Sequence, residues 1–312
     1  MRAVVVRSFG GPEALEITEV PIPEPGPGQV LIRVEAAAVN PVDAATRSGL
    51  LVDLGLLAPR EVTGIGWDVA GRVDGVGDGV SAFAPGDRVI GLRDRLDVPL
   101  GGYAEYVVLD ADAVAAAPEG ASAAEAATLP LNALTALQAL DLLALPPGGT
   151  LLVTGAAGAV GGYAVELAAL RGLRVVATAG AEDEPAVRAA GARWFVPRTA
   201  DDLAAAVRAH VPGGVDGALD AAVLGIRALG AVRNRGSFAS VIGGAAPVPL
   251  RGIEVSDVWV AADGAALAWL SSLAERGTLS LRVADTLPLE RAAHAHELLA
   301  KGGLRGRLVL TP

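Results

Sequence analysis

The chain has 312 residues, of which 52% are hydrophobic, and a formal net charge of -10 at pH 7. This length exceeds the size at which one hydrophobic core keeps growing, so it predicts two domains. The acidic balance argues against nucleic acid or an anionic membrane as a partner, because both are bound through clustered cations. Since there is no cysteine, a disulfide framework and a thiolate metal site are excluded. The apolar run before Arg7 is too short for a signal peptide, and no later uncharged apolar run reaches membrane-spanning length, so we expect a cytoplasmic protein.

The predicted elements divide the chain in two. Residues 1–118 hold short strand-like runs separated by turn clusters such as PIPEPGPG and GVGDGV, a pattern typical of an antiparallel barrel. Ser122 followed by Glu125 is then a capping-box signal, and strands and helices alternate up to about residue 264, which predicts a parallel sheet. The last two strand-like runs have no place in that sheet and are expected to return to the first domain. We therefore predict one domain over 1–118 and about 265–312, and a second over 119–264.

The stretch LLVTGAAGAVGG, residues 151–162, leads from a predicted strand into a helix. Its small side chains leave backbone N–H groups open at a helix N-terminus, where the peptide dipoles favour a phosphate. It is a variant of the dinucleotide fingerprint, with Ala156 in the place of the first glycine and Gly158 and Gly161 in the next two places. Small residues also occur in such turns because the turn is tight. The position inside a βαβ unit favours dinucleotide binding.

Several blocks, in this order along the chain, resemble the zinc-free medium-chain dehydrogenase/reductases, in the branch of quinone oxidoreductases and enoyl reductases. They are AVNPVDAATRSG, GWDVAGRVDGVGDGVSAFAPGDRV, GGYAEYVVLDAD, EAATLPLNALTALQAL, GVDGALD, LPLERAAHAHELL and RGRLVL. The resemblance implies an α/β protein built of a GroES-like barrel domain and a Rossmann domain, with the cofactor NADP(H) or NAD(H) between them. It also implies a homodimer formed by continuing the Rossmann sheet across subunits.

The resemblance assigns a set of cofactor-binding residues, most of them in the second domain. They are Asn40, Thr135, Gly155, Ala157, Gly158, Ala159, Val160, Gly161, Thr178, Ala179, Arg198, Val223, Ile242 and Gly243. Thr178, Ala179 and Gly180 stand where an acidic residue would bind the ribose 2′-hydroxyl of NAD. Arg198 stands where similar sequences carry a tyrosine that reaches the adenosine 2′-phosphate, so we predict NADPH as the cofactor. The alternative is that Arg198 is a solvated loop arginine.

The metal ligands of the zinc-dependent relatives have no counterpart in this chain. Asn40 stands in the place of the ligating cysteine, and Trp67 and Asp68 stand in the place of a His-Glu pair. Of the three histidines, His210 ends a predicted helix and His294 and His296 are two apart on another, so surface or helix-end roles are favoured over ligation. We therefore expect no metal, and without a Lewis acid the oxidation of a simple alcohol is disfavoured.

The remaining chemistry is hydride transfer to an acceptor that stabilises its own negative charge, a quinone or an α,β-unsaturated carbonyl. Asn40 and Asp43 are the catalytic candidates. Asn40 can instead be a turn residue before Pro41, and a structural role for Asp43, orienting Arg47, is preferred. A tyrosine that such enzymes often place five residues after the asparagine is Ala45 here.

Tyr103 and Trp259 are the nearest aromatic substitutes for that tyrosine, with packing the favoured role of each. The apolar segment 48–59 either packs as core or favours a hydrophobic small-molecule substrate. Two function classes stay open: a reductase of quinones or enones, and an NADPH-binding protein with little turnover.

Overall fold

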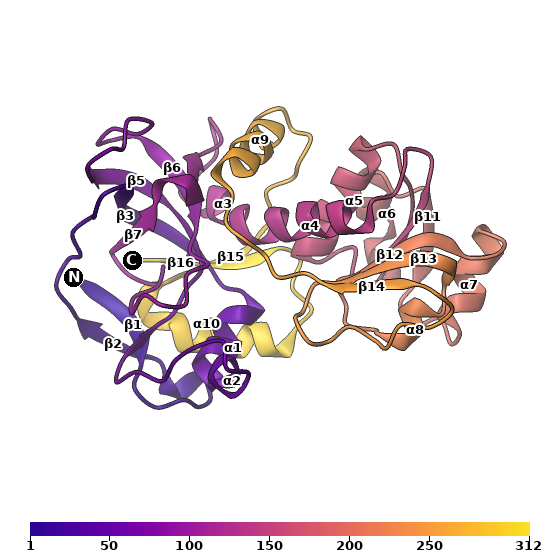
Figure 1. Cartoon of the computed structure of the whole chain (residues 1–312), viewed down its shortest axis with the longest axis horizontal. Helices are drawn as coiled ribbons and strands as arrows, with labels where there is room; N and C mark the ends of the chain where they lie inside the picture. The colour runs from indigo at the N-terminus through magenta and orange to yellow at the C-terminus, as the bar shows by residue number, and fades with distance from the viewer. The chain divides into compact units, whose positions relative to one another are not determined.

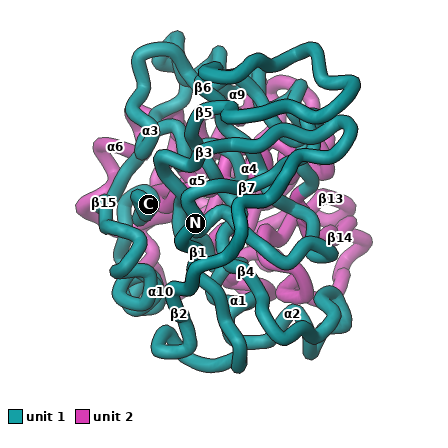
Figure 2. The backbone as a smooth tube through the Cα atoms, turned by 90° about the vertical axis from the view of Figure 1, so that its left-hand side faces the viewer, with its two compact units in different colours: residues 1–131, 261–312 teal, residues 132–260 magenta.

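The computed structural model describes all residues, 1–312, and the chain forms two compact units (Figures 1 and 2). Unit 1 comprises residues 1–131 and 261–312, and unit 2 comprises residues 132–260. The prediction placed 119–131 and 261–264 in the second domain, whereas both segments belong to unit 1. The reason is tertiary packing, because helix α3 (Ala123–Ala127) contacts strands β3 and β5 of unit 1. The predicted return of the last two strands to the first domain is confirmed.

Unit 1 is built on two sheets with almost entirely antiparallel pairing. Its strands are β1 (Arg2–Val6), β2 (Glu16–Glu19), β3 (Gln29–Ala38), β4 (Thr63–Gly64), β5 (Asp68–Val76), β6 (Arg88–Leu92), β7 (Tyr106–Asp110), β8 (Val114–Ala116), β15 (Val283–Pro288) and β16 (Arg307–Thr311). One sheet has the order β2-β1-β4 and the other β15-β16-β3-β5-β6-β8, with β7 also paired to β3. Only β15 and β16 run parallel to each other. This is the GroES-like arrangement that the sequence predicted.

Helices and short 3₁₀ turns lie in the connections between these strands. They are α1 (Pro41–Ser48), α2 (Leu50–Asp53), α3, α9 (Gly264–Glu275) and α10 (Ala292–Lys301), with short 3₁₀ turns at Pro12–Ala14, Ala111–Ala113 and Leu289–Arg291. The predicted capping box starts α3, since the Ser122 hydroxyl accepts from Glu125 N and the Glu125 carboxylate accepts from Ser122 N. Asp263 caps α9 in the same way through Ala266 N.

Unit 2 has a six-stranded sheet in which every pairing is parallel. The strands are β9 (Thr150–Thr154), β10 (Arg174–Ala179), β11 (Trp194–Pro197), β12 (Val215–Asp220), β13 (Val232–Ser240) and β14 (Glu254–Asp257). Their order, β11-β10-β9-β12-β13-β14, is that of the Rossmann fold. The order reverses between β9 and β12, and such a switch point is where open α/β sheets bind ligands.

Helices cover the Rossmann sheet on its two faces (Figure 1). They are α5 (Ala159–Leu170), α6 (Glu184–Ala189), α7 (Leu203–His210) and α8 (Ile226–Leu229), with a 3₁₀ turn at Ala181–Asp183. Side chains of α7 and α8 pack with alternate residues of the strands, such as Leu152 and Val176, while α5 contacts β9 and β10. The alternation follows from the two-residue period of a strand.

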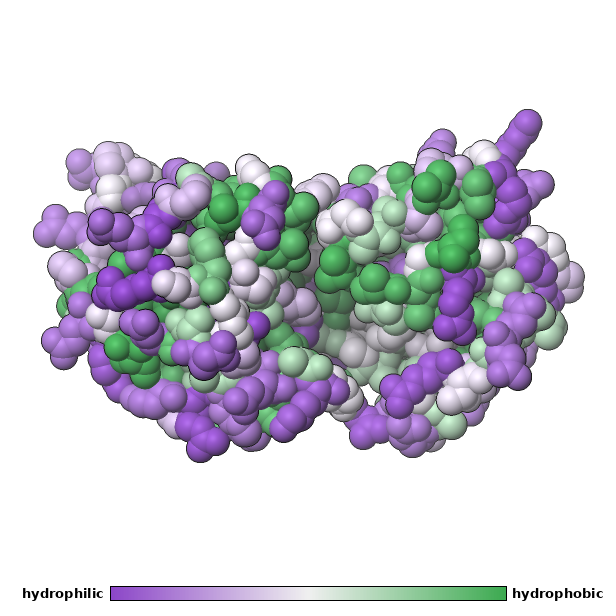
Figure 3. All heavy atoms as spheres, turned by 90° about the horizontal axis from the view of Figure 1, so that it is seen from below, coloured by the Kyte–Doolittle hydropathy of each residue, from purple (hydrophilic) through white to green (hydrophobic).

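Helix α4 (Pro130–Leu143) continues from the α3 region, and residues 123–143 are long and apolar enough to cross a membrane by length and composition. Of the most apolar window, 83% is buried inside the protein. Burial in the core accounts for that apolar composition. On the face drawn in Figure 3, unit 2 shows hydrophobic patches between hydrophilic residues.

Candidate functional site

The turn after β9 has the backbone of a phosphate cradle. Gly155 adopts φ 61°, a left-handed conformation that side chains rarely take, and Gly158 N donates to Gly155 O at 2.9 Å. A Cβ at Gly161 would lie 2.1 Å from Gly155 O, so only glycine allows this close approach of helix and turn. Gly158 is the N-cap of α5, and no side chain caps the helix. The first N–H groups of α5 are therefore suited to an anion such as the pyrophosphate of a dinucleotide.

The other predicted cofactor residues of unit 2 gather at the same edge of the sheet. Thr178 and Ala179 end β10, Arg198 follows β11, and Arg198 N donates to Ala179 O at 2.7 Å. The remaining residues are Val223 after β12, and Ile242 and Gly243 after β13. Because carboxyl ends of parallel strands meet at one edge, the structure brings these residues to the edge that holds the glycine turn. Predicted Thr135 differs, since it lies on α4 and is buried.

A buried brace at this edge was missed by the sequence analysis. Thr154 Oγ1, at the end of β9, donates to Asp220 Oδ1 at 2.5 Å, and Asp220 ends the neighbouring β12. Ala222 N donates to Thr154 Oγ1 and Gly225 N donates to Asp220 Oδ2. The brace fixes the two strand ends where the sheet order reverses, and with them the turn that starts at Gly155.

In unit 1, the catalytic candidate Asn40 is completely buried between two carboxylates. Its Nδ2 donates to Asp68 Oδ2 at 2.7 Å, and its backbone N donates to Asp43 Oδ2 at 2.7 Å. Leu131 N donates to the second oxygen of Asp68 at 2.6 Å. Asn40 is also the N-cap of α1, with Pro41 in the first turn, so the alternative turn role holds for its backbone while its side chain bonds to Asp68.

The expectation that Asp43 orients Arg47 is wrong. Asp43 Oδ2 accepts from the Tyr103 hydroxyl at 3.0 Å, besides Asn40 N, while Asp43 Oδ1 is buried without a hydrogen-bond partner. Arg47 turns away, and it donates to Gly10 O and to His296 Nδ1 at 3.2 Å. Capping of α1 holds the Asp43 carboxylate at the start of its own helix, out of reach of the next turn.

The expected surface or helix-end role is also wrong for His296. This residue is 1% exposed, in the middle of α10, with Nε2 3.5 Å from the Tyr103 hydroxyl. Since Arg47 can only donate, His296 Nδ1 accepts, and the ring proton is on Nε2. Burial, aided by Arg47, lowers the pKa of His296 to about 4, so the ring is neutral at pH 7. His294 is half-buried and pairs with Glu297, and His210 does end α7.

Burial dominates the electrostatics of the two carboxyls. It raises the pKa of Asp43 to about 7 and that of Asp68 to about 7, against hydrogen bonds that favour the charged forms. The negative charge of Asp43 also raises the pKa of Asp68. Both Asp68 oxygens accept hydrogen bonds, whereas Asp43 Oδ1 accepts none, so the ionised form of Asp43 is the less well stabilised of the two by hydrogen bonding.

The stability of Asp43→Asn relative to the parent is expected to rise as the pH increases from 5 to 8. The pKa of an unfolded aspartate is about 3.9, so the folded protein binds a proton between pH 4 and 7 that the unfolded chain does not. In the parent, the contribution of Asp43 to the free energy of unfolding is fully present below pH 4 and is lost as the pH rises through 7. The asparagine has no such loss and still offers an oxygen to Tyr103. We expect its unfolding free energy relative to the parent to rise by on the order of 2–4 kcal/mol between pH 5 and 8.

Urea unfolding at the two pH values measures this difference. Asp112→Asn, at an exposed carboxylate of the same unit, is the matched control and should show a difference that does not change with pH. The same flat result for Asp43→Asn would show that Asp43 ionises at ordinary acidic pH.

The donor set around Asn40 does not suit zinc. The Asn40 amide nitrogen donates to Asp68, and Trp67 has no metal-binding atom, so of the three residues in the ligand positions only Asp68 has an ordinary zinc ligand. No group of three or more histidine, cysteine or acidic side chains able to hold a metal ion occurs in the chain.

The apolar segment 48–59 is divided between core and surface, so packing as core holds for part of it. Helix α2 buries Leu51, and Leu57 is buried beyond it. Leu50, Leu54 and Leu56 are exposed. Tyr103 is wholly buried, while Trp259 is 60% exposed and lies over Gly243, where an added Cβ would contact its ring.

Comparison with known proteins agrees with this architecture. Residues 26–119 match the family described as alcohol dehydrogenase GroES-like domain, and residues 190–310 match the family described as zinc-binding dehydrogenase. Over 100% of both chains, the structure is similar to that of an NAD-dependent alcohol dehydrogenase, with a TM-score of 0.88 and 35% identity. Its similarity to a quinone oxidoreductase from Coxiella burnetii covers 100% of this chain and 99% of that one, with a TM-score of 0.87 and 30% identity.

The chain belongs to the medium-chain dehydrogenase/reductase superfamily, in its quinone oxidoreductase branch. A chloroplast envelope quinone oxidoreductase homolog of Arabidopsis thaliana is 41% identical over 200 residues, which are 62% of this chain and 59% of that protein. The matched part thus spans less than two thirds of this curated relative. A mycobacterial structure complexed with NADPH is 30% identical over 100% of both chains, with a TM-score of 0.85. The family is one of pyridine-nucleotide-dependent dehydrogenases.

Proposed function

We propose that this superfamily member is an NADPH-dependent oxidoreductase that transfers hydride to a quinone or an α,β-unsaturated carbonyl without a metal. The observation that carries the proposal is the bond from Asn40 Nδ2 to Asp68, at the place where zinc-dependent relatives have ligands. Without a Lewis acid, the acceptor must delocalise the negative charge that hydride addition creates. Quinones and enones do so, and simple carbonyls do not.

The carboxyl edge of the unit 2 sheet supplies the cofactor site in this proposal. The N–H groups of Ala159 and Val160 bind the pyrophosphate, the Gly155 turn lets the backbone approach it, and Arg198 takes the 2′-phosphate. When bound, reduced nicotinamide supplies the hydride.

Residues of unit 1 supply position and a proton in this proposal. Asp68 fixes the amide of Asn40 in one orientation, which preorganises it for hydrogen bonding in the site. Burial raises the pKa of Asp43 to about 7, which suits this carboxyl to supply the one proton that the anion left by hydride addition needs. The exposed leucines of segment 48–59 favour an acceptor with an apolar body, because apolar surface removed from water contributes most of the affinity in such pockets.

A titration of NADPH fluorescence, followed by a screen of quinones and enones, tests the proposal. We expect saturable NADPH binding and oxidation of NADPH by acceptors of at least one class. Dialysis against a chelator should leave the rate intact, and elemental analysis should find no stoichiometric zinc. Tight binding with no oxidation by any acceptor would favour the alternative, an NADPH-binding protein with little turnover. One zinc per chain would contradict the assignment of Trp67.

We further propose a homodimer in the cytoplasm. Strand β14 is at the edge of the Rossmann sheet, and exposed apolar residues, Val248, Leu250 and Trp259, flank it in sequence. Unpaired edge strands with apolar neighbours favour pairing with a second chain. Sedimentation velocity distinguishes a dimer of this 31.2 kDa chain from a monomer.

A further inference from the structure

Arg93, the residue after β6, is a buried cation without an anionic partner. Arg93 is 4% exposed, and its Nη2 donates to Val98 O at 2.7 Å. Nε is buried and has no hydrogen-bond partner, and no ion pair neutralises the guanidinium. Burial of an unpaired charge is costly, so such a group in a stable fold calls for a physical explanation.

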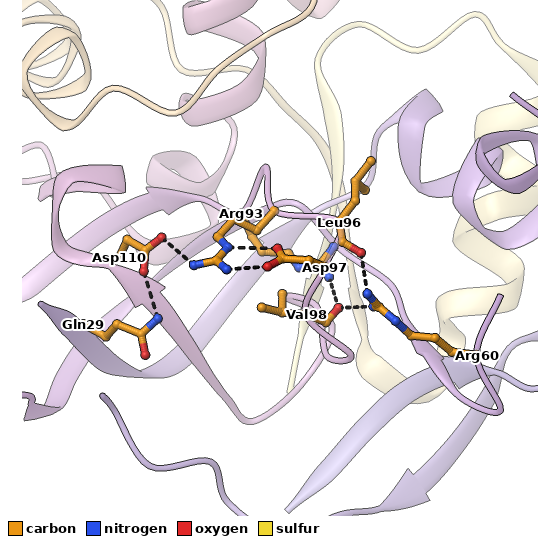
Figure 4. A network of polar contacts seen from close by, with 8 residues as sticks. Gln29, Arg60, Arg93, Leu96, Asp97, Val98 and Asp110 are labelled. Carbon is orange, nitrogen blue, oxygen red and sulfur yellow. Dashed lines mark hydrogen bonds and ion pairs between the residues drawn. The ribbon is translucent and has the colours of Figure 1, made fainter. Parts of the chain in front are cut away.

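A second guanidinium lies beside the first. Arg60 Nη1 donates to the same Val98 carbonyl at 2.7 Å and Nη2 donates to Leu96 O at 2.8 Å (Figure 4). The positive charge of Arg60, after burial itself, lowers the pKa of Arg93 to about 10, so Arg93 stays charged at pH 7. Two cations therefore share one neutral acceptor.

The carboxylates of the neighbouring loop do not serve as the missing partner. Asp94 Oδ2 accepts from Ala262 N at 2.8 Å. Asp97 pairs with Arg95, and Asp110 also accepts from Arg95. Gln29 Nε2 donates to the other oxygen of Asp110 (Figure 4). Each loop carboxylate thus already has a partner of its own.

Arg93 lies next to the Asn40 site. Its backbone N donates to Trp67 O at 2.8 Å, and the neighbouring residues Asp68 and Leu92 are partners in the β5–β6 ladder. This bond continues the β5–β6 pairing by one residue, so Trp67 and Arg93 are backbone neighbours on the two chain segments. Trp67 Nε1 is also buried without a partner, and like Arg93 Nε it can only donate. The charge of Arg93 also acts on Asp43.

We propose that Arg93, supported by Arg60, binds a carboxylate group of the acceptor and selects acceptors that carry one. The inference rests on the proposed function and narrows its substrate class to quinones or enones with an anionic substituent. A carboxylate can accept side-on from the Nε and Nη2 edge of a guanidinium, a strong and directional pair. It would also satisfy the donors that the chain leaves unpaired.

An acid and its ester test the proposal. 3-Benzoylacrylate and its methyl ester share the enone and differ in charge, so we compare kcat/KM for the two in the wild type and in Arg93→Met. We expect the acid-to-ester ratio to fall on the order of 10- to 100-fold in the variant. Arg93→Lys, which keeps the charge and loses the planar fork, should show a smaller fall. Arg95→Met, at an exposed arginine of the same loop, is the matched control and should keep the wild-type ratio.

Binding of benzoate gives a readout that needs no turnover. Benzoate should raise the melting temperature of the wild type and of Arg95→Met, and not that of Arg93→Met. Equal losses for acid and ester, or no benzoate effect on the wild type, would overturn the carboxylate site. If no acceptor oxidised NADPH, the proposed function would fail while benzoate binding still decided the role of Arg93. Circular dichroism shows whether Arg93→Met folds. If it does not, the acid-to-ester ratio of kcat/KM in Arg93→Lys is compared with that of the wild type instead.

Discussion

Replacement of Gly158 by valine is expected to abolish dinucleotide binding while the chain stays folded. A Cβ at this position meets only Gly155 O, at 3.2 Å, and Gly158 has φ -79°, which other residues adopt. The new side chain would instead occupy the space over the first turn of α5, where the proposed pyrophosphate lies. Loss of two or more charge-assisted hydrogen bonds raises the NADPH dissociation constant by at least about 100-fold. Fluorescence titration of NADPH measures it.

Gly161→Ala is the contrasting variant for this experiment. Its Cβ would lie 2.1 Å from Gly155 O and 3.0 Å from Ala156 Cα, both backbone atoms. The turn must shift, so we expect the free energy of unfolding to fall by about 1–3 kcal/mol and the melting temperature to fall with it. Unchanged NADPH affinity in well-folded Gly158→Val would remove the phosphate from this turn.

The elements that the sequence predicted well are those fixed by local patterns. The glycine turn after β9 follows from residues adjacent in sequence, and so does the capping box of Ser122 and Glu125. The return of β15 and β16 was predictable by exclusion, since a parallel sheet of six strands was already complete. In each case the evidence lay within one or two turns of chain, or in the order of the elements.

The boundary between the two units could not be predicted from the local sequence pattern. Helical spacing after Ser122 predicts a helix correctly, but which unit it joins depends on the surfaces it packs on. Helix α3 contacts β3, which is about ninety residues earlier in the chain. Long-range packing of this kind leaves no trace in the local sequence.

The site in unit 1 was only partly predictable for the same reason. His296 meets Arg47 and Tyr103 at sequence separations of 249 and 193 residues. The orphaned donors of Arg93 and Trp67 likewise depend on a ladder between separate strands. A local signal did exist for Asp43, because Asn40 followed by Pro41 and an acidic residue at the third helical position is the pattern of a capped helix start. That pattern predicts a carboxylate facing Asn40 rather than Arg47.

Arg198→Ala is expected to lower the preference for NADPH over NADH by about 10- to 100-fold, through the KM of NADPH. The structure brings Arg198 to the end of β10, where its backbone bonds to Ala179, and its side chain is exposed and forms no ion pair. A guanidinium at this edge can take the 2′-phosphate in a bidentate pair. The ratio of kcat/KM for the two cofactors measures the effect.

Two further variants bracket this prediction. Arg193, an exposed arginine, precedes the same strand that Arg198 follows, so Arg193→Ala should keep the wild-type ratio. Glu182 acts in the opposite sense, because its carboxylate folds over Gly180, where an added Cβ would lie 2.6 Å from it. A carboxylate there would repel the proposed 2′-phosphate, so Glu182→Gln should raise the NADPH preference. Equal losses with both cofactors in Arg198→Ala would assign Arg198 to folding or adenine packing. A wild-type preference for NADH would instead favour Glu182 as the group that binds the ribose hydroxyls and would remove the 2′-phosphate from Arg198.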